Sequence, residues 1–428
     1  MQLRPGYQQT GVGPIPEDWR LSSLGHEAEL LSGFPFLSQG FAASGIRLLR
    51  GSNVKRGQLD WSREITEHWP AVTSKIKQYE LQESDIVIAM DGALVGRSFA
   101  IVKRADLPSL LVQRVARVRA KATDQRLLGA WINSDYFIRH VDSVKTHTAI
   151  PHISPRDIRD FAVAIPRAES EQRAIAEALS DVDALLDGLT RLIAKKRDLK
   201  QGAMQQLLTG RTRLPGFGGE WASVRLAEIG DAYGGLTGKS SADFGAGGAR
   251  YIAFMDVIRS VSIRSGSTFE RVRVGSGEAQ NAVKRGDLLL NGSSETPEEV
   301  AMGAVCDVDE QDLFLNSFCF GFRLRPSAEA DALFLAYLLR SDAGRTVMRS
   351  LAQGSTRYNM AKSAFLDACL LLPSRSEQGT IATVLSHMDA ELAVLEARRA
   401  KTQALKQAMM QSLLTGRIRL VCPEPAHA

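Results

Sequence analysis

The feature that most constrains this chain is a long ungapped repeat. Residues 171–214 and 377–420 align at an offset of 206, with 24 of 44 positions identical. Both copies begin with the pattern EQ-x-x-IA-x-x-LS-x-x-DA and end with LLTGR-x-RL. A match of this length identifies the chain as an internal duplication in which each half carries one copy of the same segment.

Each copy has the heptad spacing of a long helix with one apolar seam. The seam of the first copy consists of Ile175, Leu179, Val182, Leu186, Leu189 and Ile193. The seam of the second copy consists of Ile381, Leu385, Met388, Leu392 and Leu395, and Arg399 takes the position of Ile193. Beyond these residues we expect the phase to slip, to Leu199, Ala203 and Leu207 in one copy and to Leu405, Met409 and Leu413 in the other.

The residue types at both ends indicate where these helices begin and end. Ser170 and Ser376 are candidate N-caps, and Gly210 and Gly416 suit the left-handed conformation that ends a helix. About 38 residues at a rise of 1.5 Å per residue give a rod of roughly 57 Å. Because each seam needs a partner and the chain has two, we expect an antiparallel coiled coil that fixes the separation of two modules.

The two modules have diverged more than the helices, yet they share a skeleton. The segment Trp19–Leu24 matches Trp221–Leu226, and Asp85–Ile88 matches Asp287–Leu290. The patterns predict strands at 46–49, 86–89, 99–102 and 112–118 and amphipathic helices at 127–141 and 332–349. We therefore predict mixed α/β (α+β) modules in tandem, related by a pseudo-two-fold repeat. The predicted segments are a first module at 1–168, a central helix at 169–213, a second module at 214–374, a C-terminal helix at 375–420 and a tail at 421–428.

Composition is that of a soluble globular protein, with 44% hydrophobic and 24% charged residues. The longest nearly unbroken apolar run, at 332–339, is too short to cross a bilayer, and the N-terminus lacks a signal-like apolar segment, so we expect a cytoplasmic location. Cys306, Cys319, Cys369 and Cys422 form no CxxC pair, and no histidine lies at zinc-finger spacing. We therefore expect no metal site.

The sequence contains no complete catalytic motif. Gly234–Ser240 ends like a phosphate-binding loop, but Tyr233 stands where that loop requires a glycine. The histidines form no HExxH pair, no serine lies in a G-x-S-x-G turn, and the [DN]PP[YF] motif of amino-methyltransferases does not occur. We expect no catalytic residues and interpret the chain as a recognition protein.

Several segments resemble, in order, the specificity subunits of type I restriction-modification systems. Tyr7–Thr10 followed by Gly13–Trp19 resembles the opening of that family, and Leu214–Phe217 leading to Glu220 and Trp221 resembles the junction before its second recognition domain. The two EQ-x-x-IA blocks with their LLTGR endings resemble the central and C-terminal repeats of the family. The resemblance covers essentially the whole chain.

This resemblance implies a DNA-specificity subunit that is not an enzyme. Each module would be a target-recognition domain reading one half of a bipartite, asymmetric DNA site, while the paired helices fix the gap between the halves. The implied partners are double-stranded DNA, two modification subunits that methylate adenine N6 and dock on the helical scaffold, and two restriction subunits that translocate and cut DNA. No cofactor is implied in this chain. S-adenosylmethionine would belong to the modification subunit, and ATP and Mg to the restriction subunit.

Polar loop residues are the candidates for DNA contact, because bases and phosphates are bound by cationic, amide and hydroxyl side chains. In the first module they are Arg50, Ser52, Asn53, Arg97, Ser98, Gln113, Arg114, Lys145, Thr146, His147 and Thr148. In the second they are Asn291, Ser293, Ser294, Asn316, Ser317, Ser355, Thr356, Arg357, Tyr358 and Asn359. The last five lie in a segment that resembles the family's Gly-Ser-Thr loop. For each residue an ordinary solvated loop side chain is the alternative interpretation.

The charge differs between the modules. The whole chain has a net charge of +5, which permits a polyanionic partner without requiring one. Residues 1–170 hold 22 Lys and Arg against 18 Asp and Glu, whereas residues 215–376 hold 17 against 19. Since phosphate neutralisation supplies most non-specific affinity, we expect tight DNA binding to require the modification subunits.

Two other function classes stay open from the sequence. One is a coiled-coil scaffold whose modules bind proteins, and the other is a DNA-modifying enzyme with an unrecognised active site. Sequence-dependent retention of DNA by the assembled complex is the observation that the DNA-reading interpretation requires.

Overall fold

A computed structural model describes residues 3–264 and 266–421, so Cys422 and nearly all of the predicted tail lie outside the described residues. The chain divides into two compact units, one made of Met1–Thr190 with Ala397–Ala428 and the other of Arg191–Glu396. Each unit contains one module and one half of each long helix. Within the described ranges, no helix combines the length and the apolar character that a membrane span needs.

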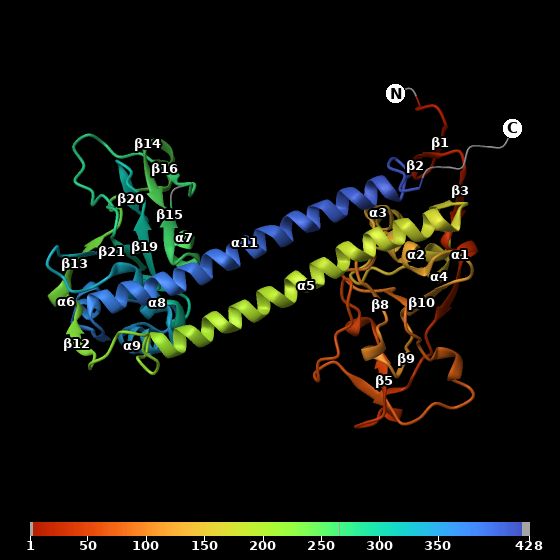
Figure 1. Ribbon diagram of the computed structural model, residues 1–428, viewed down its shortest axis with the longest axis horizontal. Coiled ribbons are helices and arrows are strands. Elements are labelled where there is room, and N and C mark those ends of the chain that lie inside the picture. Colours follow the sequence, from red (N-terminus) through yellow and green to blue (C-terminus); the bar gives the residue numbers. More distant parts are fainter. Residues whose placement is uncertain (1–2, 265, 422–428) are drawn as a thin grey trace. The chain divides into compact units, whose positions relative to one another are not determined.

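The first module is built on small sheets, drawn in red to orange in Figure 1. An antiparallel sheet has the order β4 (Ala28–Ser32), β10 (Val115–Ala120), β7 (Ile86–Ala89) and β8 (Phe99–Ile101). A second sheet has the order β6 (Glu67–Trp69), β5 (Ile46–Leu49) and β9 (Ser109–Leu111), with β5 and β9 parallel. The remaining pairs are β1 (Tyr7–Thr10) with β2 (Gly13–Pro16) and β3 (Trp19–Ser23) with β11 (Ala162–Pro166). The helices are α1 (Leu24–Glu27), α2 (Gln125–Ile132), α3 (Asp135–Val144) and α4 (Pro155–Arg159), with 3-10 turns η1 (Ser38–Gly40), η2 (Gly51–Asn53), η3 (Lys77–Tyr79) and η4 (Arg104–Asp106).

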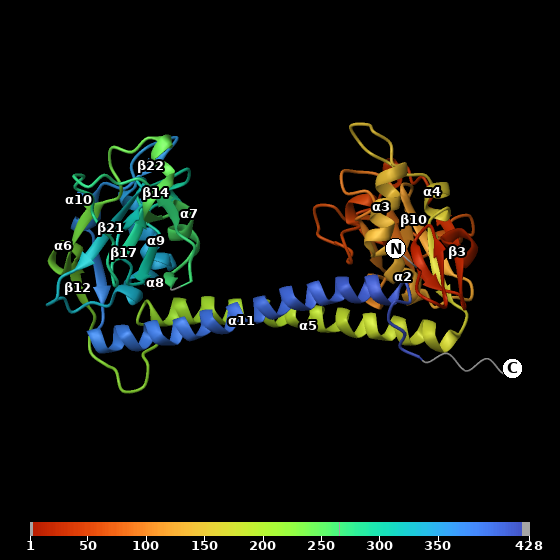
Figure 2. The same cartoon turned by 90° about the horizontal axis from the view of Figure 1, so that it is seen from above.

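The second module repeats this plan. Its main sheet has the order β13 (Gly230–Gly234), β21 (Cys319–Leu324), β17 (Leu288–Asn291), β19 (Gly303–Asp307) and β15 (Ser262–Arg264), and its smaller sheet has the order β16 (Glu270–Val272), β14 (Phe244–Ile252) and β20 (Leu313–Leu315). The remaining pairs are β12 (Ala222–Arg225) with β23 (Cys369–Leu372) and β18 (Ser293–Ser294) with β22 (Tyr358–Asn359). The helices are α6 (Leu226–Ile229), α7 (Phe254–Arg259), α8 (Ala332–Arg340), α9 (Asp342–Leu351) and α10 (Lys362–Asp367), with 3-10 turns η5 (Ser241–Asp243) and η6 (Pro297–Glu299). Figure 2 shows α8 beside the strands of the main sheet, and α9 packs against α8.

The shared plan confirms the predicted duplication of mixed modules, but several predicted elements are shortened or divided. The predicted strand at 112–118 is shortened: residues 113 and 114 form a turn, where Arg114 adopts a positive φ of 74°, and only its 115–118 part lies in a strand, β10. The predicted helix at 127–141 is divided where Ser134 caps α3, and the one at 332–349 is divided where Ser341 caps α9. In both cases a serine hydroxyl accepts a backbone N–H and starts a new helix within a continuous apolar pattern.

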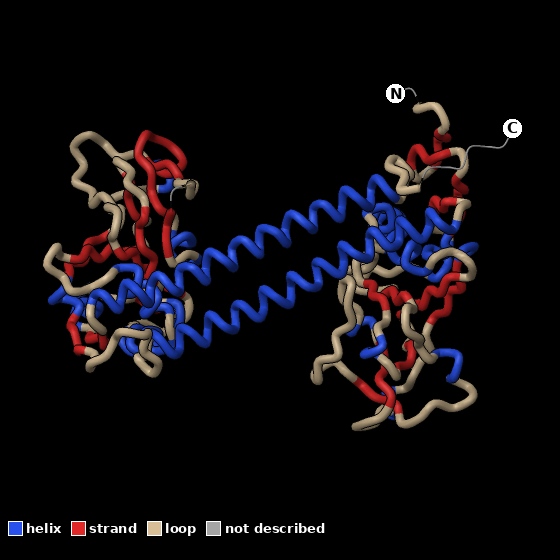
Figure 3. The backbone as a smooth tube through the Cα atoms, in the orientation of Figure 1, coloured by secondary structure: helices blue, strands red, loops and turns tan. Residues whose placement is uncertain are grey.

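The two repeat segments form long helices, α5 (Glu169–Leu207) and α11 (Arg375–Leu413), each continuous in Figure 3. Both begin before the predicted N-caps, so Ser170 and Ser376 lie in the first turn and are not the caps that the sequence predicted. For α11 the hydroxyl of Ser374 accepts the N–H of Glu377 at 3.4 Å. Gly210 and Gly416 have φ values of 70° and 66°, the left-handed conformation predicted for the helix ends.

Within each unit the start of one long helix packs beside the end of the other. In the first unit, Ile175 and Leu179 of α5 share a core with Met410 and Leu413 of α11. In the second unit, Ile381 and Leu385 of α11 share a core with Met204 and Leu207 of α5. The helix halves are therefore antiparallel in each unit, and both anchor on the core of the module beside them.

The seam keeps its phase where the sequence predicted a slip. Of the predicted seam residues, Val182, Leu186, Met388 and Leu395 are half-buried and the other seven apolar ones are buried. However, Leu199 and Leu405 are 51% and 55% exposed, so the expected slip is wrong. The heptad position is taken instead by Lys200 and Lys406, and Lys406 is only 7% exposed. A lysine can occupy a seam because its aliphatic stem packs against apolar neighbours while its ammonium group finds a partner.

Along with the uninterrupted heptad phase, two equivalent ion pairs connect the facing helices. Lys406 pairs with Asp183 in the first unit, and Lys200 pairs with Asp389 in the second. Both lysines and both aspartates are related by the repeat offset of 206. Tyr337 also donates its hydroxyl to Asp389 at 2.7 Å and ties α8 to the pair.

The ends of the repeats also bind each other crosswise. Glu171, at the start of α5, pairs with Arg419 after α11, whose Nη2 lies 2.7 Å from Oε2 of Glu171. Glu377, at the start of α11, pairs with Arg213 after α5, whose Nε lies 2.6 Å from Oε1 of Glu377. The glutamate of the EQ motif and the second arginine of the LLTGR-x-RL motif thus join the two copies of the repeat. Each pairing is made within a single compact unit.

Candidate nucleic-acid interface

Three polar segments of the second module meet at one end of its main sheet. The N–H of Gly292 donates to the carbonyl of Phe318 at 2.8 Å, and the N–H of Met360 donates to the carbonyl of Gly292 at 2.9 Å. The strands β18 and β22 pair beside these bonds. The loop at 316–318 and the segment at 353–360 are thereby held against the end of β17.

The first module has the same arrangement. The N–H of Met90 donates to the carbonyl of Arg114 at 2.9 Å, and the N–H of Ile153 donates to the carbonyl of Met90 at 2.8 Å. Met90, Arg114 and Ile153 therefore correspond to Gly292, Phe318 and Met360. We call each set of three segments a reading edge: residues 90–92, 113–114 and 145–153 in the first module, and residues 291–294, 316–318 and 353–360 in the second.

Most exposed candidates for DNA contact lie on these two edges. On the first edge Gln113, Arg114, His147 and Thr148 are exposed, and no ion pair or side-chain hydrogen bond involves Arg114 among the described residues. On the second edge the exposed candidates are Ser317, Ser355, Thr356, Arg357 and Asn359. Ser52 is exposed in η2, away from the hydrogen bonds that define the first edge.

Two candidate asparagines are buried, and their side-chain amides form hydrogen bonds with the protein backbone. Asn53 accepts the N–H of Arg50 at 3.0 Å and donates to the carbonyl of Asp60 at 2.9 Å. Asn291 accepts the N–H of Met302 at 2.7 Å and donates to the carbonyl of Glu299 at 2.7 Å. Each amide satisfies a backbone N–H and a backbone carbonyl that have no partner in a regular strand or helix. We therefore interpret both asparagines as residues that fix the conformation of their loops. Ser98, Ser293 and Ser294 are also buried.

Several cationic candidates are paired within the protein. Arg97 and Lys145 both bind Asp142, at 3.3 and 2.6 Å. The hydrogen bond from Lys145 and the charge of Arg97 lower the pKa of Asp142. Arg50 donates to the carbonyl of Ile65 at 2.6 Å. These pairs order the loops and leave Arg114 and Arg357 as the exposed guanidinium groups among the candidates.

The remaining candidates are tied into local hydrogen bonds. The hydroxyl of Thr146 lies 2.9 Å from Nδ1 of His152. The amide oxygen of Asn316 accepts the N–H of Phe318 at 2.9 Å. Tyr358 is half-buried in β22.

Sequence reasoning missed the apolar members of both edges. Phe318 is 54% exposed, and the guanidinium carbon of Arg357 lies 5.4 Å from the centre of its ring. On the first edge Ile150 is exposed, and Leu94 is exposed in a loop that adjoins the edge, where Gly92 donates to the carbonyl of Pro151 at 3.0 Å. The sequence predicted only polar side chains as DNA contacts, and residue type alone gives no sign that these apolar side chains are exposed.

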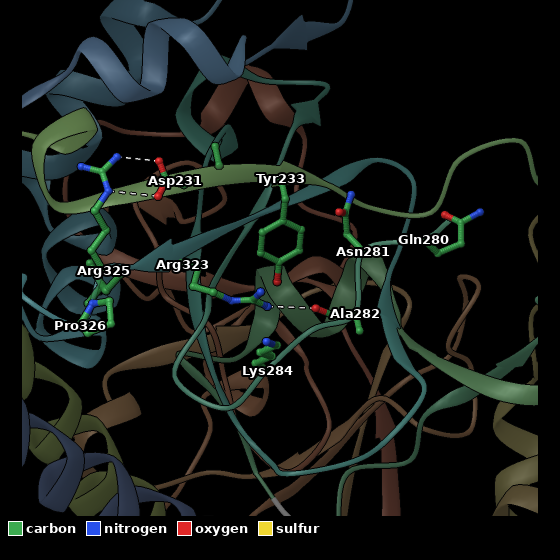
Figure 4. A pocket seen from close by; sticks show the side chains of 11 residues that line it. Asp231, Tyr233, Gln280, Asn281, Ala282, Lys284, Arg323, Arg325 and Pro326 are labelled. Atoms are coloured by element: carbon green, nitrogen blue, oxygen red, sulfur yellow. Dashed lines mark hydrogen bonds and ion pairs between the residues drawn. The ribbon is translucent and has the colours of Figure 1, made fainter. Parts of the chain in front are cut away.

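A pocket of about 450 Å³ lies at the other end of β21, and Figure 4 shows its lining. Arg323 pairs with Asp287 at 2.6 Å, and Arg325 pairs with Asp231 at 2.6 Å. Burial raises the pKa of Tyr233, and the Asp287 carboxylate, which accepts the Tyr233 hydroxyl at 2.6 Å, raises it further. The network joins β13 to β21 and supplies no activated nucleophile. Across residues 3–264 and 266–421, no cluster of three or more His, Cys, Asp or Glu side chains suits a metal ion.

Two modules with equivalent edges, joined by a duplicated helix, define a two-part recognition protein. The family model described as the type I restriction modification DNA specificity domain matches residues 52–196 and 218–404, and the chain belongs to this family. The chain is 32% identical over 184 residues to the specificity subunit of the type I restriction enzyme EcoAI from Escherichia coli, covering 42% of this chain and 30% of that protein. It is 29% identical over 213 residues to the MjaVIII specificity subunit from Methanocaldococcus jannaschii, covering 49% of each chain. The matched part thus spans less than half the length of these curated relatives.

Solved structures share the fold over nearly the whole chain. The S subunit of a type I restriction-modification system from M. genitalium superposes with a TM-score of 0.60 at 13% identity, covering 97% of this chain and 98% of that one. A chain from a structure describing complex assembly and conformational transition of the type I R-M system superposes with a TM-score of 0.54 at 16% identity, covering 94% and 99%. At these identities the likeness supports the fold alone.

Proposed function

We propose that this chain recognises a bipartite, asymmetric DNA site and directs adenine-N6 methylation and restriction by partner subunits. The observation that carries the proposal is the pair of reading edges. Their backbone hydrogen bonds are the same in both modules, but the side chains that they present differ. This is the arrangement expected of two readers that dock alike on DNA and select different bases.

The proposed partners are two modification subunits, two restriction subunits and double-stranded DNA. The restriction enzymes to which the two curated relatives belong are named as type I, and both relatives are named as specificity subunits. In this proposal the chain is not an enzyme: S-adenosylmethionine is bound by the modification subunit, and ATP and Mg by the restriction subunit. The exposed faces of α5 and α11 are the proposed docking scaffold, and the length of these helices sets the gap between the half-sites.

We further propose that tight DNA binding requires the modification subunits. Residues 215–376, which cover the second module, hold 17 Lys and Arg against 19 Asp and Glu, so the module's own attraction for phosphates is weak. Many of its arginines are also engaged within the protein. Arg340, for example, donates to four backbone carbonyls, and burial lowers its pKa to about 10.

A gel-shift competition with the assembled complex tests the proposal. Labelled genomic fragments are incubated with the chain and its modification subunits, and unlabelled fragments of defined sequence compete. We expect retention of a subset of fragments that share one two-part motif, and tenfold or greater weakening when either half is scrambled. Equal competition by all sequences would contradict DNA reading and favour a scaffold that binds proteins.

A further inference from the structure

The two reading edges are built around the same four-residue turn. In the first module the N–H of Val115 donates to the carbonyl of Val112 at 3.1 Å, and in the second the N–H of Cys319 donates to the carbonyl of Asn316 at 3.0 Å. The two tip residues are Gln113 and Arg114 in one turn and Ser317 and Phe318 in the other, and all four are exposed. Arg114 and Phe318 thus occupy equivalent places.

The chemistry of the two tips differs. Arginine and glutamine make paired hydrogen bonds to guanine and adenine in the major groove. The Phe318 ring can make none of these bonds, yet three hydrogen bonds fix the turn that carries it. Its N–H donates to Asn316 at 2.9 Å, its carbonyl accepts from Gly292 at 2.8 Å, and the turn closes through Cys319. The fold therefore holds an apolar group where the other module holds a guanidinium group.

We infer that Phe318 is a specificity-determining residue that contacts the C5-methyl group of a thymine in the half-site of the second module. The methyl group is the one apolar feature that a base pair displays in the major groove, and phenylalanine is among the side chains that contact it. This inference rests on the proposed function. It adds that the two half-sites are read by different chemistry at the same position of the fold.

The neighbours of Phe318 fit this assignment. Arg357 lies over the ring at 5.4 Å, which limits ring motion and places a positive charge beside it for a nearby phosphate or base edge. The hydroxyls of Ser317, Ser355 and Thr356 are exposed on the same edge. An isolated exposed apolar side chain is ordinary on a protein surface. Here the ring lies among hydrogen-bonding groups, on a turn that is fixed by backbone hydrogen bonds. An ordinary solvent-exposed loop does not require such a fixed turn.

The test replaces thymine with deoxyuridine, which lacks only the methyl group. The DNA motif of the complex is first determined, and each thymine on either strand is then replaced singly. Affinity is measured with the full chain and its modification subunits, for the wild type, Phe318→Ala and Phe318→Leu. Arg114→Ala is the matched control, because it alters the equivalent turn of the other module. Thermal unfolding verifies that each variant folds.

We expect one thymine whose replacement weakens wild-type binding about fourfold, the worth of one buried methyl group. Phe318→Ala should remove that sensitivity, Phe318→Leu should retain most of it, and Arg114→Ala should leave it unchanged. If Phe318 were a wedge between base steps, its removal would weaken binding while the deoxyuridine effect persisted, and the inference would be wrong. A motif without such a thymine also overturns it. Sequence-specific binding that lacks the Phe318-dependent effect contradicts this inference alone, whereas loss of all sequence dependence contradicts the proposed function.

Discussion

Arg114 shows how backbone conformation and neighbouring charges determine whether a side chain is available for DNA contact. It sits at a positive φ of 74° at the tip of a turn, and among the described residues no carboxylate pairs with it. The neighbouring cations Arg97 and Lys145 share Asp142 and are less available. The guanidinium group of Arg114 is therefore the best placed on the first edge to read a base.

We predict that Arg114→Ala weakens binding of the assembled complex to its cognate site by about 5- to 150-fold, the 1–3 kcal/mol of a paired arginine contact. Discrimination should be lost at one base pair, and affinity for random DNA should change little. Binding titrations with cognate and single-substitution duplexes measure both effects. Arg126→Ala, outside the reading edges, is the control. Uniform weakening on all sequences would instead indicate a phosphate contact.

Glu27 is a buried carboxylate that stabilises the first module. It is 4% exposed, and although burial alone would raise its pKa, hydrogen bonds from Arg20, Ser22 and Thr123 lower the pKa to about 2. Because the folded pKa lies below the ordinary value of 4.5, this stabilisation is complete above about pH 4.5 and is lost as the pH falls toward 2. The ionised form of Glu27 thus stabilises the folded state at neutral pH.

We predict that Glu27→Gln lowers the free energy of unfolding by about 2–3 kcal/mol at pH 7. The difference from the wild type should shrink between pH 4.5 and 3. Unfolding in urea at several pH values measures it, with the exposed Glu17→Gln as the control. A difference that is the same at pH 7 and pH 3 would show that the carboxylate charge is not the cause.

At the scale of the helix, the matched ion pairs explain why the seam tolerates charge. Lys406 is 7% exposed, while the side chain of Asp183 is 54% exposed. The buried ammonium group of Lys406 therefore depends on the ion pair more than the exposed carboxylate of Asp183 does. The sequence marked these positions as polar and so suggested a phase slip. The lysine side chain fills the heptad position because its ammonium group pairs with an aspartate on the facing helix. A sequence pattern that considers one residue at a time does not detect such a pair.

We predict that Asp183→Asn destabilises the first unit by about 1–3 kcal/mol, because it leaves the Lys406 ammonium buried without a counter-charge. Lys406→Met should cost less than 1 kcal/mol, since its apolar chain fills the same space and Asp183 stays hydrated. Urea unfolding of the full chain compares the two, with Asp181→Asn as the exposed control. Equal effects of both substitutions would rule out this account of the pair.

The whole molecule is where the sequence was most informative. The offset of 206 and its shared motifs identified the duplication, and the crosswise pairs of Glu171 with Arg419 and Glu377 with Arg213 explain why these motifs are alike in both copies. The candidate DNA-contacting residues were harder to predict from the sequence. Asn53 and Asn291 looked like base readers but are buried in their loops, and Phe318 was overlooked because its exposure depends on where a turn falls. Loop residues acquire their roles from non-local hydrogen bonds that residue type does not encode.

The difference in charge between the modules has a consequence for the complete molecule. The chain alone should bind DNA only weakly at physiological salt, and the modification subunits should raise affinity at least a hundredfold. Titrations of the purified chain with and without these subunits, at two salt concentrations, measure the gain. Tight and sequence-specific binding by the chain alone would contradict the proposed dependence on its partners.

The central claim is that this chain selects the site at which partner subunits methylate DNA. It is tested most directly by comparing N6-methyladenine across the genome, with and without the gene, in cells that express the system. We predict that deletion removes methylation from one bipartite, asymmetric motif, leaves every other motif unchanged, and is reversed by the intact gene. An unchanged pattern of N6-methyladenine after deletion would contradict the account.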